Sequence, residues 1–351
     1  MRHERQTRLY KKSNTGYFVN AVIIRQSNMG SEATLKLLDK GHVDALLDHE
    51  QALQAVREAF TLHSLGDGQV FSVVRESLST GGIFGIKSGG VSNQNLLGFK
   101  AAGFWPNNRK LGSEPHQATI MLIDPLTGRP QCLIDGNTIT TLRTGAAGAL
   151  GLQLLARPES TNVCVFGSGV QARVQIDYAL QVIPGITYVL YLTATGKPDI
   201  EFERRFASRV EVTHCTDADK SVCESDVVIT ATPGSGPLFD SESVQAGTHI
   251  TCVGADTKGK RELPEGLLAR ARVVVDDRIQ AQSIGECQWD TKIDSTELGD
   301  LITGTARLDR GPYDITIFDM TGLALQDLAV ARRLYNQACE KQVGHDIAWP
   351  W

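Results

Sequence analysis

One stretch of ten residues constrains the fold of this chain more than any other. Residues 163–172 read V-C-V-F-G-S-G-V-Q-A, an apolar strand followed by a glycine turn at 167–169 and a helix that begins at Val170. Such a turn presents free backbone N–H groups and the positive end of a helix dipole, which together bind a phosphate. Ala172 replaces the third glycine of the usual dinucleotide fingerprint and is still small enough for close packing. An ordinary strand–helix turn is the alternative interpretation of this motif on its own.

The segment after residue 158 alternates apolar strands with helical stretches. The expected strands are 163–166, 188–192, 210–213, 227–230, 249–253 and 273–275, with a final strand at 315–318. Alternation of this kind predicts an α/β fold with a Rossmann-type, doubly wound parallel sheet. We assign residues 151–321 to this dinucleotide-binding domain.

The remaining residues predict a second, α+β domain. A helical pattern covers 35–65, and glycine-rich strands follow between 70 and 134 with the character of an antiparallel sheet. A helix at 322–338 is expected to return to this domain. We therefore predict a substrate and dimerisation domain of residues 34–150 plus 322–351, and an N-terminal extension, 1–33. That extension is basic, and we interpret it as a disordered tail or a misassigned start, with a targeting presequence as the alternative.

Composition narrows the class of protein. A net charge of -5 over 351 residues gives no sign of a nucleic-acid or anionic-membrane partner. No apolar run approaches the roughly 20 residues that a transmembrane helix needs. The seven cysteines contain no C-x-x-C pair and lie mostly in apolar contexts, which predicts a reducing cytoplasm. No cluster of His, Cys and Asp has metal-ligand spacing, so no metal site is expected.

Several charged residues occur where solvated side chains are unexpected. Lys100 lies in the apolar run G-F-K-A-A-G, where a buried lysine must pair or lose its proton; a lysine that extends to solvent is the alternative. Arg143 opens a helix of small residues and could bind a carboxylate or phosphate, or form a surface salt bridge. Asp256 follows the strand at 249–253, at the edge where parallel sheets bind ligands, and could be a general acid or base or a turn residue. His116 is the most suggestive histidine, although lone histidines are more often structural.

Taken in order, five motifs resemble those of the ornithine cyclodeaminase/μ-crystallin family. They are G-F-K at 98–100, T-G-R-P with L-I-D-G-N-T-I-T-T-L-R-T-G-A-A at 127–147, G-S-G-V-Q-A at 167–172, V-G-A-D-T-K-G-K-R-E-L at 253–263 and D-M-T-G-L-A-L-Q-D at 319–327. The resemblance implies an enzyme that uses NAD(H) or NADP(H) and acts on the C–N bond of an α-amino or α-imino acid. It also implies a two-domain subunit and a homodimer.

The resemblance further implies roles for individual residues. Arg75, Lys100 and Arg143 would hold the substrate carboxylate, and Lys100 and Asp256 would be the catalytic residues. The expected cofactor contacts are Arg143, Thr144, Gly167, Gly169, Val170, Gln171, Thr193, Thr232, Val253, Lys260 and Thr321. Thr193 occupies the position where an acidic residue would favour NAD and an arginine would favour NADP, so the choice between them stays open.

Two departures from the family pattern bear on the substrate. This chain has Lys87-Ser88 where many relatives have Met-Pro, and Pro115-His116 where cyclodeaminases have a threonine. If Lys87 and His116 face the pocket, they favour a second carboxylate through charge-assisted hydrogen bonds. The best prediction is therefore reduction of iminosuccinate to aspartate. The alternatives are an ornithine cyclodeaminase, an alanine dehydrogenase or pyrroline-2-carboxylate reductase, and a non-catalytic, crystallin-like ligand-binding protein.

Overall fold

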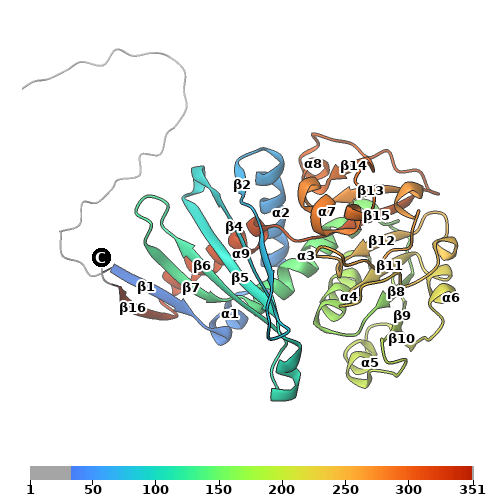
Figure 1. Ribbon diagram of the computed structural model, residues 1–351, viewed down its shortest axis with the longest axis horizontal. Helices are drawn as coiled ribbons and strands as arrows, with labels where there is room; N and C mark the ends of the chain where they lie inside the picture. Colours follow the sequence, from blue (N-terminus) through green and yellow to red (C-terminus); the bar gives the residue numbers. More distant parts are fainter. Residues whose placement is uncertain (1–32, 350–351) are drawn as a thin grey trace, which may run out of the picture.

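Two eight-stranded sheets organise the molecule, and helices lie between them. The computed structural model describes residues 33–349. Figure 1 shows one sheet on each side of α2 (His49–Ser64), α3 (Asn137–Leu155) and α9 (Ala324–Lys341). These three helices pack against one another, and α9 also packs on the first sheet while α3 reaches the second. The predicted class, a parallel α/β sheet with a second α+β unit, is confirmed.

The first sheet is mostly antiparallel, and we call it the mixed sheet. Its strand order is β16 (His345–Trp349), β1 (Ala33–Leu38), β7 (Pro130–Asp135), β6 (His116–Ile123), β5 (Leu96–Phe104), β4 (Ile83–Val91) and β2 (Gly68–Val70), with β3 (Val74–Ser77) beside β4. Only β1 and β7 are parallel neighbours. Alternate residues of β4, β5 and β6 turn towards α9, so one face of the sheet is buried in the core between the sheets.

The helical pattern predicted for residues 35–65 is wrong at its start. Residues 33–38 form β1, and the helices α1 (Lys40–Leu46) and α2 follow. A short apolar run fits a strand or a helix equally well, and here pairing with β7 and β16 decides the outcome. The N-caps agree with the local signals, since Asp48 accepts a hydrogen bond from the backbone N–H of Gln51 at 2.8 Å. Strands β16 and β1 were not predicted.

The second sheet is wholly parallel. Its order is β10 (Glu211–His214), β9 (Tyr188–Leu192), β8 (Asn162–Phe166), β11 (Val227–Thr230), β12 (His249–Cys252), β15 (Ile315–Asp319), β13 (Ala271–Val275) and β14 (Ser295–Glu297). The chain runs outward from β8 through β9 and β10, then returns to β11 on the other side of β8. This reversal creates the crevice in which open parallel sheets bind ligands. The predicted final strand, β15, lies inside the sheet, and the additional strand β14 was missed.

Helices cover both faces of the parallel sheet. Side chains of α4 (Val170–Val182) and α5 (Ile200–Phe206) pack with one set of alternate strand residues, and those of α6 (Ala218–Cys223) and α7 (Arg278–Ile284) pack with the other. Among the helices of residues 33–349, none has both the length and the apolar character needed to cross a bilayer. The predicted domain boundary at residue 150 falls inside α3, so the division of the chain into the two ranges stays a prediction. The predicted extension 1–33 lies outside the described residues, except that Ala33 already belongs to β1.

Candidate functional site

Four of the predicted substrate residues share one face of the mixed sheet. Lys87 on β4 lies directly opposite Lys100 on β5, and Arg75 on β3 lies opposite Gly85, two residues before Lys87. His116 begins β6 opposite Phe104, four residues beyond Lys100. Because residues two apart on a strand point the same way, all four side chains turn towards the core between the sheets. Arg143 approaches from α3 on that same side.

Lys100 and Arg143 meet at a buried carboxylate. Asp327, in the first turn of α9, has one oxygen 2.7 Å from Lys100 Nζ and the other 3.1 Å from Arg143 Nε. All three residues are buried, and Asp327 is 0% exposed. Burial, together with the nearby Arg143 charge, lowers the pKa of Lys100 to about 7. Burial alone would raise the pKa of Asp327, yet Lys100 and Arg143 hold it below its ordinary value.

Lys87 donates hydrogen bonds to backbone carbonyl groups. Its Nζ donates to the carbonyl oxygens of Thr321 and Gly322 at 2.6 and 2.8 Å. The N–H groups of those two residues donate to Asp276, which also accepts from the Thr321 hydroxyl. Lys87 therefore uses two of its three protons to hold the segment that joins β15 to α9. Burial and the Arg143 charge lower the pKa of Lys87 to about 8, which reflects positive charge without a full counter-ion.

Asp256 lies just beyond the carboxyl end of β12, between two cations. Its oxygens are 3.3 Å from Arg75 Nη2 and 2.8 Å from Lys260 Nζ, and the Thr257 hydroxyl donates to it at 3.1 Å. Burial opposes ionisation, but Lys260 and Arg75 hold the pKa of Asp256 well below its usual range. Asp256 is thus a carboxylate at neutral pH and links the parallel sheet to the Arg75 strand of the mixed sheet.

His116 is a neutral group in this environment. Its Nδ1 lies 3.2 Å from Asn137 Oδ1 at the start of α3. Burial and the Lys100 charge lower the pKa of His116 to about 4. The lowered pKa favours the neutral imidazole, and assistance of a second carboxylate by His116 stays a prediction.

The predicted cofactor residues gather at the carboxyl edge of the parallel sheet. Gly167, Thr193, Thr232, Val253 and Thr321 each follow the end of a strand within two residues. Gly167 has φ +106°, and a Cβ there would lie 2.7 Å from the Ala231 carbonyl oxygen. A Cβ on Gly169 would meet nothing within 4 Å, and no side chain caps α4, which begins at Val170. Open space in front of uncapped helix N–H groups fits a pyrophosphate.

Several of the predicted cofactor residues form hydrogen bonds within the protein. Thr232 donates through its N–H and its hydroxyl to Glu262, which also accepts from the Gly254 N–H at 2.9 Å, so one carboxylate ties the loops after β11 and β12 together. The Thr144 hydroxyl donates to the Thr140 carbonyl oxygen. Thr193 donates to the Lys197 carbonyl oxygen at 2.8 Å. Gln171 Oε1 is buried without a hydrogen-bond partner among the described residues, which leaves it available to a ligand.

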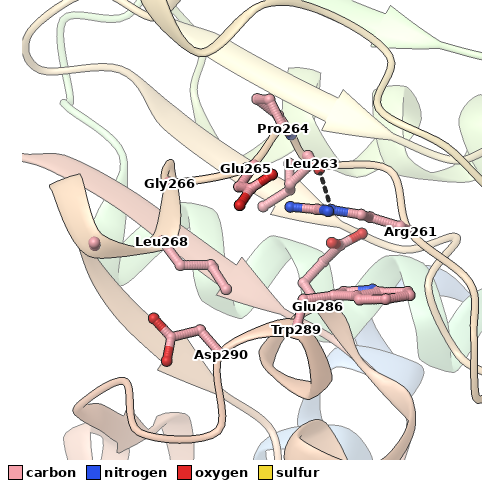
Figure 2. Close-up of a pocket in the computed structure, with 10 residues that line it drawn as sticks. Arg261, Leu263, Pro264, Glu265, Gly266, Leu268, Glu286, Trp289 and Asp290 are labelled. Carbon is pink, nitrogen blue, oxygen red and sulfur yellow. Dashed lines mark hydrogen bonds between the residues drawn. The ribbon is translucent and has the colours of Figure 1, made fainter.

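A pocket lies behind the loop that carries Asp256 and Lys260. The space has a volume of about 220 Å³, and the Arg261 guanidinium lies over the Trp289 ring, 5.3 Å from its centroid. Figure 2 shows these two side chains at the pocket. Trp289 Nε1 donates to the Lys260 carbonyl oxygen at 2.9 Å, and Glu286 accepts from the Glu262 N–H. The pocket wall thus anchors the loop through Trp289.

Sequence reasoning missed three acidic groups of this region: Asp327, Asp276 and Glu262. All three are buried and each bonds a residue that the sequence did single out, Lys100, Thr321 and Thr232 respectively. A signal existed for Asp327, since the run A-L-Q-D-L-A-V-A surrounds one acidic residue with apolar ones. An acidic residue within an apolar helix requires a buried partner.

Comparison with known proteins agrees with this architecture. The profile of the Ornithine cyclodeaminase/mu-crystallin family matches residues 35–342. The chain belongs to this family. The iminosuccinate reductase of Paracoccus denitrificans is 35% identical over 315 residues, which cover 87% of this chain and 97% of that protein.

Solved structures of family members share the fold. An archaeal alanine dehydrogenase dimer with bound NAD has a TM-score of 0.84 at 32% identity and covers 91% of this chain and 100% of that chain. The crystal structure of the Paracoccus denitrificans iminosuccinate reductase in complex with NAD+ has a TM-score of 0.80 at 33% identity, with 90% of this chain and 99% of that chain covered. Both superpositions extend over the two sheets described above.

Proposed function

We propose that this protein is an NAD(P)-dependent oxidoreductase that reduces the C=N bond of an α-imino acid, with iminosuccinate as the substrate and aspartate as the product. The observation that carries the proposal is an excess of positive charge between the two sheets. Five cations lie there, and among the described residues only Asp256 and Asp327 form ion pairs with them; the cations are Arg75, Lys87, Lys100, Arg143 and Lys260.

The contacts of Lys87 and Lys100 support a dianionic substrate. Lys100 shares the Asp327 carboxylate with Arg143, and Lys87 donates to two backbone carbonyl oxygens and forms no ion pair among the described residues. Two substrate carboxylates would supply the missing negative charge and raise both pKa values on binding. Both arginines keep a nitrogen without a hydrogen-bond partner among the described residues, Nη2 of Arg143 and Nε of Arg75. We therefore assign one carboxylate to Arg143, with Lys100 beside it, and the other to Arg75.

The proposed chemistry divides between the cofactor and the chain. NAD(P)H supplies the hydride that reduces the imine carbon. Lys100 Nζ, with its pKa of about 7, holds a proton that it can pass to the imine nitrogen at neutral pH. Asp256, which is ionised, accepts a hydrogen bond from the same nitrogen and favours its protonated, positively charged form. The addition of one hydride and one proton converts the imine to the amine.

The relatives support this reaction class and leave the substrate to experiment. Absorbance of NADH and of NADPH would be followed with iminosuccinate, with pyruvate plus ammonia, and with pyrroline-2-carboxylate, while ornithine is tested for ammonia release. We expect stoichiometric consumption of the reduced cofactor, fastest with iminosuccinate. Ammonia release from ornithine without net cofactor consumption would instead identify a cyclodeaminase. Cofactor binding without turnover of any substrate would identify a non-catalytic binding protein.

We also propose that the protein is a cytoplasmic homodimer. The face of the mixed sheet that turns away from the helices carries the half-buried apolar side chains of Ile86, Phe99, Met121 and Leu133. An apolar sheet face of this kind suits a second copy of the chain. Met121→Lys would then shift the molar mass measured by light scattering from dimer to monomer. All seven cysteines are free thiols, in keeping with a reducing compartment.

A further inference from the structure

Among residues 33–349, Asp327 alone forms an ion pair with both Lys100 and Arg143. The carboxylate uses its two oxygens on two different elements, Oδ2 on Lys100 of β5 and Oδ1 on Arg143 of α3, while Asp327 itself belongs to α9. No other described group donates a hydrogen bond to Oδ2. One side chain therefore joins the sheet to the two helices that cover it, at the point where the predicted substrate cations meet.

The geometry of Arg143 shows which of its donors remain for a ligand. Its Nε donates to Asp327 and its Nη1 donates to Gln326 Oε1 at 3.2 Å, so α9 occupies one side of the guanidinium group. Gly322 also lies close to the guanidinium group, since a Cβ at this glycine would be 2.5 Å from Nη1 and 3.2 Å from Nη2. The guanidinium plane is thus fixed on two sides, and Nη2 is the nitrogen without a hydrogen bond to the described residues.

Asp327 is not required to begin α9. The helix starts at Ala324 with Leu323 as its N-cap and without a side-chain capping bond, and Asp327 does not bond a backbone N–H. Its burial at 0% exposure would be unfavourable without both cations. Conversely, Lys100 and Arg143 repel each other, and a shared anion lets them stay close together.

We infer that Asp327 is a positioning residue of the proposed active site, whose carboxylate fixes the separation and orientation of the Lys100 ammonium and the Arg143 guanidinium. The inference rests on the proposed function, because it assigns those two cations to the substrate. A purely structural ion pair would affect stability alone. A positioning residue also changes how the substrate binds and the pH at which Lys100 loses its proton.

The first experiment compares Asp327→Asn with Asp226→Asn. Asp226 pairs with Arg157 and accepts hydrogen bonds from the backbone N–H groups of Thr161 and Asn162 in the parallel sheet. It forms no ion pair with the five cations of the candidate site, so it serves as a matched carboxylate control. For Asp327→Asn we expect kcat/KM for iminosuccinate to fall by about 10-fold or more, mainly through KM, as expected for the loss of a charge-assisted contact. The change in kcat/KM that follows the ionisation of Lys100 near pH 7, which we call the pH limb, should move to lower pH. The reason is that the carboxylate that favoured the protonated lysine has been removed. Asp327→Glu should restore part of the activity.

The far-UV circular dichroism spectrum of Asp327→Asn should match that of the wild type and serves as the test of an intact fold. A variant that folds normally and keeps the wild-type KM and pH limb would overturn the inference. If the wild type oxidises NAD(P)H with none of the imino acids tested, the proposed function itself is wrong. That result is distinguishable from an active wild type with an unaffected Asp327→Asn variant.

A second measurement does not depend on turnover. Thermal unfolding of Asp327→Asn, Lys100→Met and the double variant forms a double-mutant cycle. We expect the double variant to melt at a higher temperature than the sum of the two single shifts predicts, because neither partner is then left charged and alone. If Asp327→Asn alone does not fold but the double variant does, this rescue reports the same coupling between the two residues. Additive shifts would contradict the contact on which the inference depends.

Discussion

At the scale of single residues, Lys100 is the group whose chemistry depends most on its surroundings. It is 4% exposed and its pKa is about 7, so it can exchange a proton near neutral pH. We predict that Lys100→Met lowers kcat by about 10²-fold or more, the usual contribution of a positioned acid or base. Steady-state kinetics with iminosuccinate would measure this. Lys36→Met is the matched control, since Lys36 is also buried but pairs with Asp346 at the edge of the mixed sheet. Equal losses in both variants would point to destabilisation and not to catalysis.

Thr193 gives a second prediction at this scale. Its described hydrogen-bond partners are Lys197, Thr195 and His214, none of them a carboxylate, so Thr193 brings no negative charge of its own against the 2′-phosphate of NADP. We predict that NADPH is used as well as NADH, and that Thr193→Asp lowers kcat/KM for NADPH by at least about 10-fold while NADH is spared. The ratio of the two values checks this. Thr193→Ser should behave as the wild type, and equal losses with both cofactors in Thr193→Asp would contradict the prediction.

The residues of the site divide by how visible they were in the sequence. Lys100, Arg143 and Asp256 were predictable because a charge in an apolar strand, at a helix start or after a parallel strand has few ordinary explanations. The contacts of Lys87 with the carbonyl oxygens of residues 321–322 were not, since they join segments more than 230 positions apart. Sequence pattern reports which residues need a partner, and only the folded chain decides which partner each receives.

At the scale of elements, the turn between β8 and α4 offers two glycines with opposite constraints. Gly167 has φ +106°, and a Cβ would press on the Ala231 carbonyl oxygen at 2.7 Å, whereas a Cβ on Gly169 meets only open space. We predict that Gly167→Ala destabilises the protein by about 1–3 kcal/mol, the cost of such a backbone conformation. Gly169→Ala should leave stability unchanged and weaken NADH binding, because its Cβ would enter the space of the pyrophosphate. Denaturant unfolding and NADH titration separate the two effects, and unaltered NADH affinity in Gly169→Ala would argue against the placement of the pyrophosphate.

The elements that the sequence missed have a common cause. Strands β1, β14 and β16 are at most six residues long and lie at or next to a sheet edge, where they are stabilised by one or two neighbours distant in sequence. Strands β8, β9, β11 and β12 were found because buried central strands of a parallel sheet are continuous apolar runs between helices. Local pattern thus predicts the centre of each sheet better than its edges.

At the scale of the whole molecule, polar contacts between the unit of the mixed sheet and the unit of the parallel sheet hold the site together. His63 of α2 lies 3.1 Å from Asp277, the N-cap of α7, and 3.5 Å from Glu297 at the end of β14. Together with Asp256–Arg75 and Lys87 on residues 321–322, this contact joins the mixed sheet's unit to the parallel sheet. These three polar contacts therefore fix the position of the mixed sheet's unit relative to the parallel sheet at the candidate site.

The same packing buries carboxyl groups beneath the cofactor edge, and it predicts a pH dependence of stability. Burial, with Asp319 nearby, raises the pKa of Glu286 to about 8, and burial raises that of Asp319 to about 7. A carboxyl whose folded pKa is raised stabilises the fold fully below its unfolded value near 4, and that stabilisation is lost as pH rises through the folded pKa. We therefore expect the contribution of these two carboxyl groups to the free energy of unfolding to decline between about pH 4 and pH 8.

Glu286→Gln tests this dependence, because glutamine keeps an oxygen that can accept from the Glu262 N–H but cannot ionise. We predict that the variant is more stable than the wild type at pH 8 by on the order of 1–2 kcal/mol, and that the difference shrinks as pH falls towards 5. Urea unfolding at several pH values measures both. Glu265, an exposed residue of the pocket in Figure 2, gives the control Glu265→Gln, which should follow the wild-type profile. If the free energy of unfolding of Glu286→Gln changes with pH as that of the wild type does, Glu286 is already ionised in the folded protein. The backbone N–H groups around it would then stabilise its charge.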